Sequence, residues 1–530
     1  MKYFLSYLLL CTCYFFAQAQ PKYEMRGVWI TTVFGNDYPS QINANAGLTQ
    51  KKELEQMIEK LASQGFNCIF LQVRPAADAF YDSPFEPWSE WLTGKQGEKP
   101  NPMFDPLEVA VAACRKHQIE IHAWINPYRA VFNIEKSNLS TTHPLNQHPE
   151  WFMSYGKKKL FNPALPEVRN YITQIATYLV QKYDIDGIHL DDYFYPYPEN
   201  NIELNDQYYY TLYRTSEKQN IADWRRENIN ALISLMSKKI KEVKPYIKFG
   251  VSPFGVWRNK KDDVLGSDTQ AGQPSYDNLY ADIRKWLQNA WIDYAIPQIY
   301  WSMEHPKANF RTLVQWWAEN SFGKHIYIGH ALYKIEDQTG DTRWNLENEI
   351  PQQIRFVREK AVQGSAFFRA KFLLKNSKSI VDSLAQFYQV PALCPTMTWI
   401  DSIAPEKITE IEVIKDPEYL QLKWQAPNAA IDGEQAYRYL VYRVPLDNPF
   451  IEVEDMKQVV YLGNEPIWKD YATTTEENYL YCITALDRMN NESAPQIVYV
   501  FRAGKDPQDS SLIWTNMPLK KKKVDTSLLK

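Results

Sequence analysis

The sequence predicts an α/β protein, in which a (β/α)8 TIM barrel is followed by a small all-β sandwich domain. Between residues 26 and 389, strand-like stretches alternate with amphipathic helical stretches eight times, which is the repeat of such a barrel. Beyond residue 390 the helical pattern stops, and short runs with strand character follow. A chain of 530 residues is too long for one ordinary core, which also favours division into domains.

The eight predicted strands are rich in β-branched and aromatic residues. They cover residues 26–33, 67–75, 120–129, 186–194, 248–258, 292–301, 325–334 and 364–370. The predicted helices cover residues 49–64, 105–118, 166–183, 219–244, 276–289, 307–320, 346–363 and 376–389. A doubly wound open sheet is the alternative, but it does not need eight units, and no glycine-rich phosphate loop follows the first strand.

Connections that leave a predicted strand are much longer than connections that enter one. The long ones cover residues 76–104, 130–165, 195–218 and 259–275. In barrel enzymes the loops that follow the strands build the active site, so these loops are expected to wall an extended groove. Insertions without a functional role would be expected at both ends of the barrel, whereas these long loops all follow strands and so lie at one end.

The two ends of the chain differ from its middle. Residues 1–19 read as a signal peptide, with Lys2, an apolar run and a small-x-small cleavage site, so an exported protein of the periplasm or cell envelope is expected, rather than a lipoprotein. The barrel is assigned to residues 24–390, a linker to 391–406, the sandwich to 407–503 and a flexible tail to 504–530. Within the sandwich, LKWQAP, YRYLVYRV and YLYCITALDRMNNESAP resemble a fibronectin type III module.

Composition narrows the functional classes. A net charge of -4 and a pI near 6.1 give no overall positive electrostatic field that would bind nucleic acid. After the signal peptide, no stretch of the sequence is apolar for long enough to span a bilayer. Aromatic residues make up 14% of the chain, which suits stacking on sugar rings. The cysteines outside the signal peptide are widely spaced and are expected to be buried free thiols: Cys68, Cys114, Cys394 and Cys482. No cofactor or metal is expected.

The segment 186–196, with the sequence DGIHLDDYFYP, carries the strongest functional signal. Ile188 and Leu190 have one parity of the predicted strand, while His189 and Asp191 have the other and should point into the barrel. A second aspartate follows directly, where the strand ends. Two adjacent carboxylates are costly to bury, so their position at a strand's carboxyl end favours a catalytic role over helix capping.

Glycosidic bond cleavage suits these carboxylates, because its transition state carries positive charge and its leaving oxygen needs a proton. Asp191 is the first candidate for a nucleophile or charge stabiliser. Asp192 is a candidate for the acid, or for a group that polarises an N-acetyl substituent. Adjacent aspartates do not readily flank a bond from opposite faces, and Glu304, beyond the sixth strand, is the nearest candidate for a separated acid.

The other strand ends supply candidate substrate-binding residues, which hydrogen-bond sugar substituents or stack on sugar rings. They are Trp29, Arg74, Asn126, Tyr128, Arg129, His189, Tyr193, Arg258, Gln298, Tyr300, Trp301 and Tyr333. A metal site built from His189, the aspartates and His330 is disfavoured, because neither H-x-H nor HExxH spacing is present. A serine nucleophile is disfavoured because there is no G-x-S-x-G motif.

Six blocks in order resemble the glycosyl hydrolase-like 10 family over roughly residues 24–390: RGVWITT, FNCIFLQVRP, HAWINPYR, DGIHLDDYFYP, VSPFGVWR and PQIYW. The resemblance implies an exported barrel glycoside hydrolase, with peptidoglycan strands that lack stem peptides as the expected substrate. The fourth strand also resembles the family 18 chitinase motif DGxDxDxE, but Tyr193 stands where that motif has its acid. Alternatives are a hydrolase of another polysaccharide, α-glucan or chitin-like, and a catalytically inactive glycan-binding protein.

Overall fold

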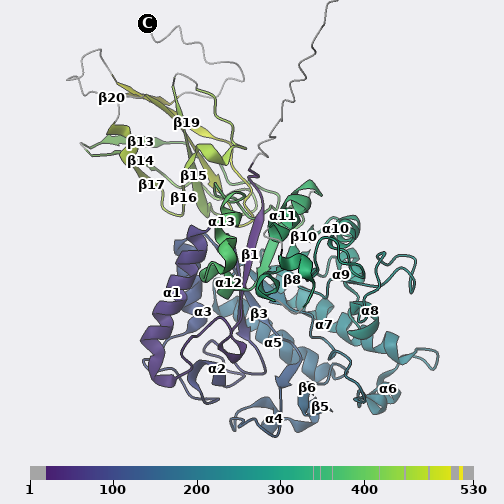
Figure 1. Ribbon diagram of the computed structural model, residues 1–530. Helices are drawn as coiled ribbons and strands as arrows, with labels where there is room; N and C mark the ends of the chain where they lie inside the picture. The colour runs from purple at the N-terminus through teal and green to yellow at the C-terminus, as the bar shows by residue number, and fades with distance from the viewer. Residues whose placement is uncertain are drawn as a thin grey trace, which may run out of the picture.

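Figure 1 shows the computed structural model of the chain. The structure describes residues 20–502, except 338–339, 346–347, 361, 417, 447–448 and 475–477, and also residues 512–516. The expected signal peptide, residues 1–19, lies outside the described residues, as do 504–511 and 517–530 of the expected tail.

Parallel strands form the central ring, which confirms the predicted barrel. They are β1 (Met25–Ile30), β2 (Cys68–Arg74), β3 (Glu120–Ile125), β7 (Gly187–Leu190), β8 (Lys248–Val251), β9 (Tyr294–Ala295), β10 (His325–Ile326), β11 (Ile328–Ala331) and β12 (Gly364–Phe368). The sheet order is β10-β9-β8-β7-β3-β2-β1-β12-β11. Only Tyr327 separates β10 from β11, and because β10 pairs with β9 while β11 pairs with β12, this divided strand closes the ring.

Helices surround the ring, as Figure 1 shows. They are α1 (Gly47–Ser63), α3 (Pro106–Lys116), α5 (Pro166–Lys182), α7 (Ile221–Val243), α8 (Ser275–Asn278), α9 (Ile283–Gln288), α10 (Phe310–Glu319), α11 (Glu349–Glu359), α12 (Ala370–Leu374) and α13 (Ile380–Ala385). Side-chain caps fix several starts: Asp105 accepts hydrogen bonds from the Leu107 and Glu108 amides, with Pro106 in the first turn. The helix expected over 276–289 is instead two short helices, α8 and α9.

Side chains alternate between the two faces of the ring as the strand pattern predicts. Ile188 and Leu190 of β7 belong to the large core between the ring and the helices. Trp29 of β1 and Phe70 of β2 belong to a separate core inside the ring. His189 points into the same interior, where its ring lies 4.5 Å from that of Phe70. The parity argument that aimed His189 into the barrel is therefore confirmed.

Several predicted strands run too far at their carboxyl ends. The fifth ends at Val251 rather than 258, and the sixth at Ala295 rather than 301. Pro253 and Pro297 lie two residues beyond these ends, and because proline has no N–H to donate, continuous pairing breaks there; only isolated bridges follow, from Gln298 to Phe254 and to Gly329. The chain beyond these points is free to turn across the rim.

The long connections build a layer over the rim at which the strands end. They hold α2 (Glu90–Thr93), α4 (Pro144–Gln147), α6 (Gln207–Tyr213) and a small antiparallel sheet of β4 (Arg129–Val131), β5 (Phe152–Tyr155) and β6 (Lys158–Phe161). In Figure 1 this layer lies at the bottom, away from the sandwich. Arg129, predicted at the end of the third strand, instead begins β4 and pairs with Leu160 of β6.

Two antiparallel sheets follow the barrel and confirm the all-β prediction. One contains β13 (Ile411–Lys415), β14 (Leu420–Trp424) and β17 (Ile467–Asp470); the other contains β16 (Val459–Gly463), β15 (Arg438–Pro445), β18 (Tyr479–Leu486), β19 (Gln496–Arg502) and β20 (Leu512–Asn516). Sequence reasoning did not anticipate β17, β19 or β20, and β20 lies inside the expected tail. The fibronectin type III assignment stays a prediction.

The turn between β18 and β19 closes the base of the barrel. Met489 is 2% exposed and packs in the core inside the ring. The Asn490 side chain donates to the Cys394 carbonyl at 2.9 Å, and Arg488 lies 2.8 Å from Asp184. These contacts tie the sandwich to the amino-terminal end of the barrel, opposite the long loops.

Two further expectations concern the whole chain. The cysteines Cys68, Cys114, Cys394 and Cys482 are free and buried, as predicted. Among the described residues, no helix combines the length and apolarity needed to cross a membrane.

Candidate active site

A cavity of about 530 Å³ lies at the rim where the barrel strands end. Aromatic side chains make up much of its wall, and Asp191 and Asp192 are the carboxylates among the described residues that line it. Its lining includes Trp29, Gln72, Trp124, Arg129, Tyr193, Tyr197, Ser252, Phe254, Gln298, Tyr300, Trp301, Tyr333, Lys334 and Phe368. The predicted convergence of far-apart strand ends around the aspartate pair is therefore present.

Asp191 is held by a chain of amide side chains. Asn126 donates through Nδ2 to Asp191 Oδ2, and the Tyr193 amide approaches Oδ1 at 3.4 Å. Gln72 Nε2 donates in turn to Asn126 Oδ1 at 2.7 Å, while the Thr32 amide donates to Gln72 Oε1 at 2.9 Å. Because both oxygens of Asp191 accept hydrogen bonds from N–H groups, the carboxylate has a fixed orientation.

Asp192 has a different set of partners. The Tyr197 hydroxyl donates to Asp192 Oδ2. Asp192 is only 5% exposed although it borders the cavity. The Gln298 side chain also hydrogen-bonds the Asp192 carboxyl, so Tyr197 and Gln298 both favour its ionised form.

Burial raises the pKa of both aspartates, because a buried carboxylate loses its hydration. For Asp191 burial raises the pKa to about 7, with Arg129 opposing the rise and the charge on Asp192 adding to it. For Asp192 burial also raises the pKa, against hydrogen bonds from Tyr197 and Gln298. Since each negative charge opposes the other, ionisation of both carboxyl groups together is disfavoured.

Under the cavity floor, His189 connects two of the lining residues. Trp29 Nε1 donates to His189 Nε2 at 3.1 Å, and the Ser252 hydroxyl lies 3.1 Å from the same nitrogen. The proton on His189 is therefore on Nδ1, which lies 3.1 Å from the Tyr294 hydroxyl. Burial lowers the pKa of His189 well below its ordinary value, so the ring is neutral and serves to position Trp29.

The predicted site residues divide into three groups. Those that line the cavity are Trp29, Arg129, Asp191, Asp192, Tyr193, Gln298, Tyr300, Trp301 and Tyr333. Asn126 and His189 do not line it, but they hydrogen-bond residues that do. The remaining four, Arg74, Tyr128, Arg258 and Glu304, lie elsewhere, and their predicted roles are corrected below.

Glu304 and Arg258 are engaged by surface ion pairs away from the cavity. The Glu304 side chain is 63% exposed and pairs with Arg311 at 2.9 Å, so it is not the separated acid that the sequence suggested. Arg258 lies between Asp263 and Asp277, at 2.8 and 2.9 Å. Both residues follow strands that end earlier than predicted, which carries them away from the rim.

Arg74 and Tyr128 are structural. Arg74 is completely buried and makes two hydrogen bonds to Glu86, of 2.7 and 2.6 Å. It also donates to the carbonyls of Asn126 and Pro127, which fixes the turn that follows β3. Tyr128 is 1% exposed and packs in the outer core.

Sequence reasoning missed Tyr197, which hydrogen-bonds Asp192, and Gln72, which hydrogen-bonds the Asn126 side chain that holds Asp191. Gln72 could have been found, because it shares the inward parity of Phe70 and Arg74 on the same strand. Tyr197 lies in a loop, where no periodicity indicates which way a side chain points. Its position follows from the path of the chain after β7.

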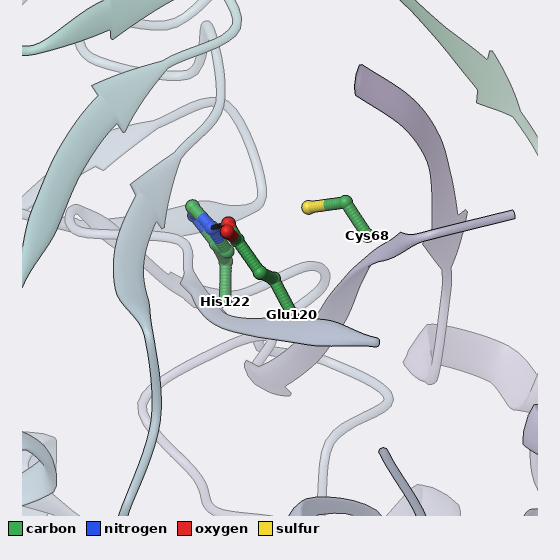
Figure 2. Close-up of side chains that lie close together, drawn as sticks. All are labelled: Cys68, Glu120 and His122. Carbon is green, nitrogen blue, oxygen red and sulfur yellow. Dashed lines mark ion pairs between the residues drawn. The ribbon is translucent and has the colours of Figure 1, made fainter. Parts of the chain in front are cut away.

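Cys68, Glu120 and His122 offer one ligand atom each within 4.8 Å, as Figure 2 shows. They lie towards the base of the barrel, on β2 and β3, rather than beside the aspartates. Lys248 Nζ lies 2.7 Å from both carboxylate oxygens of Glu120 and supplies the compensating charge. Burial raises the pKa of Cys68 well above its ordinary value, so the thiol is protonated, while Glu120 is ion-paired with Lys248.

The comparisons with known proteins agree with one another. A family profile described as glycosyl hydrolase-like 10 matches residues 24–345. The chain is 40% identical over 492 residues to glycosyl hydrolase YngK of Bacillus subtilis (strain 168), covering 90% of this chain and 94% of that protein. It is 36% identical over 378 residues to glycosyl hydrolase DigH of Escherichia coli (strain K12), covering 67% and 85%.

Among solved structures, the PgaB (BpsB) glycoside hydrolase domain from Bordetella bronchiseptica aligns with a TM-score of 0.45 and 10% identity. That alignment covers 69% of this chain and 99% of the other, and so remote a likeness has no bearing on activity. The family profile and the two sequence relatives are sufficient: the chain belongs to the glycosyl hydrolase-like 10 family.

Proposed function

We propose that this protein is a glycoside hydrolase of the cell envelope that cleaves peptidoglycan strands lacking stem peptides. The observation that carries the proposal is the buried Asp191–Asp192 pair in an aromatic-lined cavity at the carboxyl rim of the barrel. Membership of the glycosyl hydrolase-like 10 family supports glycan hydrolysis in general. The finer substrate assignment follows from the resemblance and from the chemistry of the site.

The arrangement of the carboxylates favours participation by the substrate. A retaining or inverting enzyme with two protein carboxylates needs them on opposite sides of the scissile bond, roughly 5 to 9.5 Å apart. Adjacent residues do not meet that need, and no third carboxylate among the described residues lines the cavity. An N-acetyl group on the sugar provides the missing nucleophile, which is why we propose a substrate rich in N-acetyl sugars.

In the proposed first step, the acetamido carbonyl oxygen attacks the anomeric carbon and the bond to the leaving oxygen breaks. Asp192 gives its proton to that oxygen, and the Tyr197 hydroxyl holds Asp192 Oδ2 in place. Above its raised pKa of about 7, Asp191 is ionised and accepts the acetamido N–H, stabilising the positive charge that develops on the ring and acetamido group. Its hydrogen bond from Asn126 favours the ionised form.

In the second step, water attacks the anomeric carbon and the bond to the acetamido oxygen breaks. The water passes a proton to Asp192, which restores the starting state and gives a product with retained configuration. The cycle therefore needs one proton on the pair, which agrees with the rise of the Asp191 pKa to about 7 and with the raised pKa of Asp192.

Three preparations test the proposal: peptidoglycan strands freed of peptides, chitin oligomers and starch, with released reducing ends measured by mass spectrometry. We expect release from the peptide-free strands and little or none from starch. Asp192→Asn should lower kcat by about 10²- to 10⁴-fold, the usual contribution of a general acid. Glu304→Gln, a matched amide variant outside the cavity, should retain activity.

Full activity in Asp192→Asn would refute the assigned chemistry. Tight binding of the strands without turnover by the parent protein would favour the glycan-binding alternative. Faster release from starch would refute the N-acetyl assignment.

A further inference from the structure

Arg129 places at the cavity a positive charge that forms no ion pair with a described carboxylate. Its guanidinium lies 4.3 Å from the ring centre of Tyr193 and 5.1 Å from that of Phe132. It makes no side-chain hydrogen bond or ion pair with any residue that the structure describes. The guanidinium carbon lies over both rings, and its N–H groups donate to no described side chain.

Other cations near the rim are already in use. Lys334 lines the same cavity, but its Nζ lies 3.2 Å from Asp337. Arg74 is bound to Glu86 inside the core, and Arg258 is bound by two aspartates. Arg129 is therefore the cation at this cavity that is best placed to meet an anionic group of a ligand.

Main-chain pairing fixes the position of Arg129. The residue begins β4 and pairs with Leu160 of β6, so its backbone belongs to the small sheet above the rim. The Tyr193 ring that supports the guanidinium follows directly after the aspartate pair and is 42% exposed. The donors thus lie beside the reacting position, on the open side of the cavity.

We propose that Arg129 binds a free carboxylate on the glycan, the lactyl carboxylate of muramic acid, an inference that rests on the proposed function. In intact peptidoglycan this carboxyl group is joined to the stem peptide as an uncharged amide. Removal of the peptide releases a carboxylate, and the planar guanidinium matches its two oxygens. Arg129 would therefore be the residue by which the site prefers peptide-free strands.

The competing role for Arg129 is electrostatic support of the aspartates, since its charge lowers the pKa of Asp191. That role predicts equal effects on charged and uncharged substrates. A carboxylate-binding role predicts an effect on charged substrates alone. Uronic acids also carry a carboxylate, so the test includes a uronic acid polymer to distinguish that carboxylate from the lactyl carboxylate of muramic acid.

The experiment compares kcat/KM on three substrates: peptide-free strands, the same strands with their carboxyl groups reduced to alcohols, and hyaluronan oligosaccharides. The parent should prefer the free carboxylate over the alcohol by about 10- to 100-fold, the range for a hydrogen bond to a charged group. Arg129→Gln should abolish that preference, chiefly through a higher KM on the charged strands. Arg129→Lys should retain part of it, and Lys334→Gln should retain most of it.

Equal losses on charged and reduced strands in Arg129→Gln, with a displaced pH profile, would overturn the proposal in favour of support for the aspartates. Faster cleavage of hyaluronan than of peptide-free strands would overturn the lactyl assignment. Should the parent cleave none of the substrates, the proposed function fails. Calorimetric binding of charged against reduced strands, with and without Arg129→Gln, then decides the inference independently.

Discussion

Replacing Asp191 with asparagine should make the protein more stable at neutral and alkaline pH. The carboxyl is 4% exposed, and burial raises its pKa from 3.8 to about 7. Between these two values the folded protein holds a proton that the unfolded chain has lost. The folded form binds more protons in this window, so the parent's free energy of unfolding falls as the pH rises.

The size of the effect follows from the same values. A carboxyl whose pKa is about 7 instead of 3.8 loses about 4 kcal/mol of stability across the window, at 1.36 kcal/mol per pH unit. Asparagine has no proton to lose, and its side-chain oxygen still accepts the hydrogen bond from Asn126. The variant should therefore gain about 2 to 4 kcal/mol over the parent between pH 4 and pH 8.

Urea denaturation at half-unit steps from pH 4 to pH 8.5 measures this difference. Asp82→Asn is the matched control, because its side chain is 53% exposed and the variant should follow the parent's stability closely at every pH. A difference between Asp191→Asn and the parent that stays constant with pH would refute the reasoning. It would mean that the folded protein does not hold the extra proton.

Two further predictions concern the acid and the domain contact. Tyr197→Phe removes a hydrogen bond that favours ionised Asp192, so the pKa of Asp192 should rise. The alkaline limb of the kcat/KM profile should therefore move up by about one pH unit. A limb that stays in place or moves down would count against Asp192 as the acid. Met489→Ala truncates a side chain that is 2% exposed at the base of the barrel, and it should lower the free energy of unfolding by about 2–5 kcal/mol, measured by urea denaturation. A decrease below about 1 kcal/mol would show that this contact of the sandwich does not stabilise the barrel.

Sequence periodicity was sufficient for the barrel, because inward and outward residues alternate strictly on its strands. Trp29 and His189 could be placed in the interior from parity alone, and the structure puts them there. Parity stops being informative where a strand ends. Arg258 and Glu304 were assigned to the rim because their strands were expected to continue, whereas Pro253 and Pro297 end the ladders early.

The alternation of residues along a strand also does not predict which inward side chains are buried in ion pairs with residues of the loops. Arg74 has the inward parity of a ligand-binding residue, but Glu86, twelve residues further on in a loop, binds it inside the core. Tyr197 reaches Asp192 from another loop. Both partners depend on how long loops fold back over the rim, which local sequence does not specify.

In the proposed mechanism, the acetamido group of the substrate is the nucleophile, because the part of the chain that the structure describes places no separated second carboxylate at the cavity beside Asp191 and Asp192. The most direct measurement compares single-turnover cleavage of peptide-free strands that carry N-acetyl groups with strands re-acylated with N-trifluoroacetyl groups. Fluorine withdraws electron density from the carbonyl oxygen, so the account predicts a rate at least about tenfold lower, or about 1.4 kcal/mol on the barrier. Equal rates on the two substrates would contradict it, because the attacking group would then belong to the protein or to water.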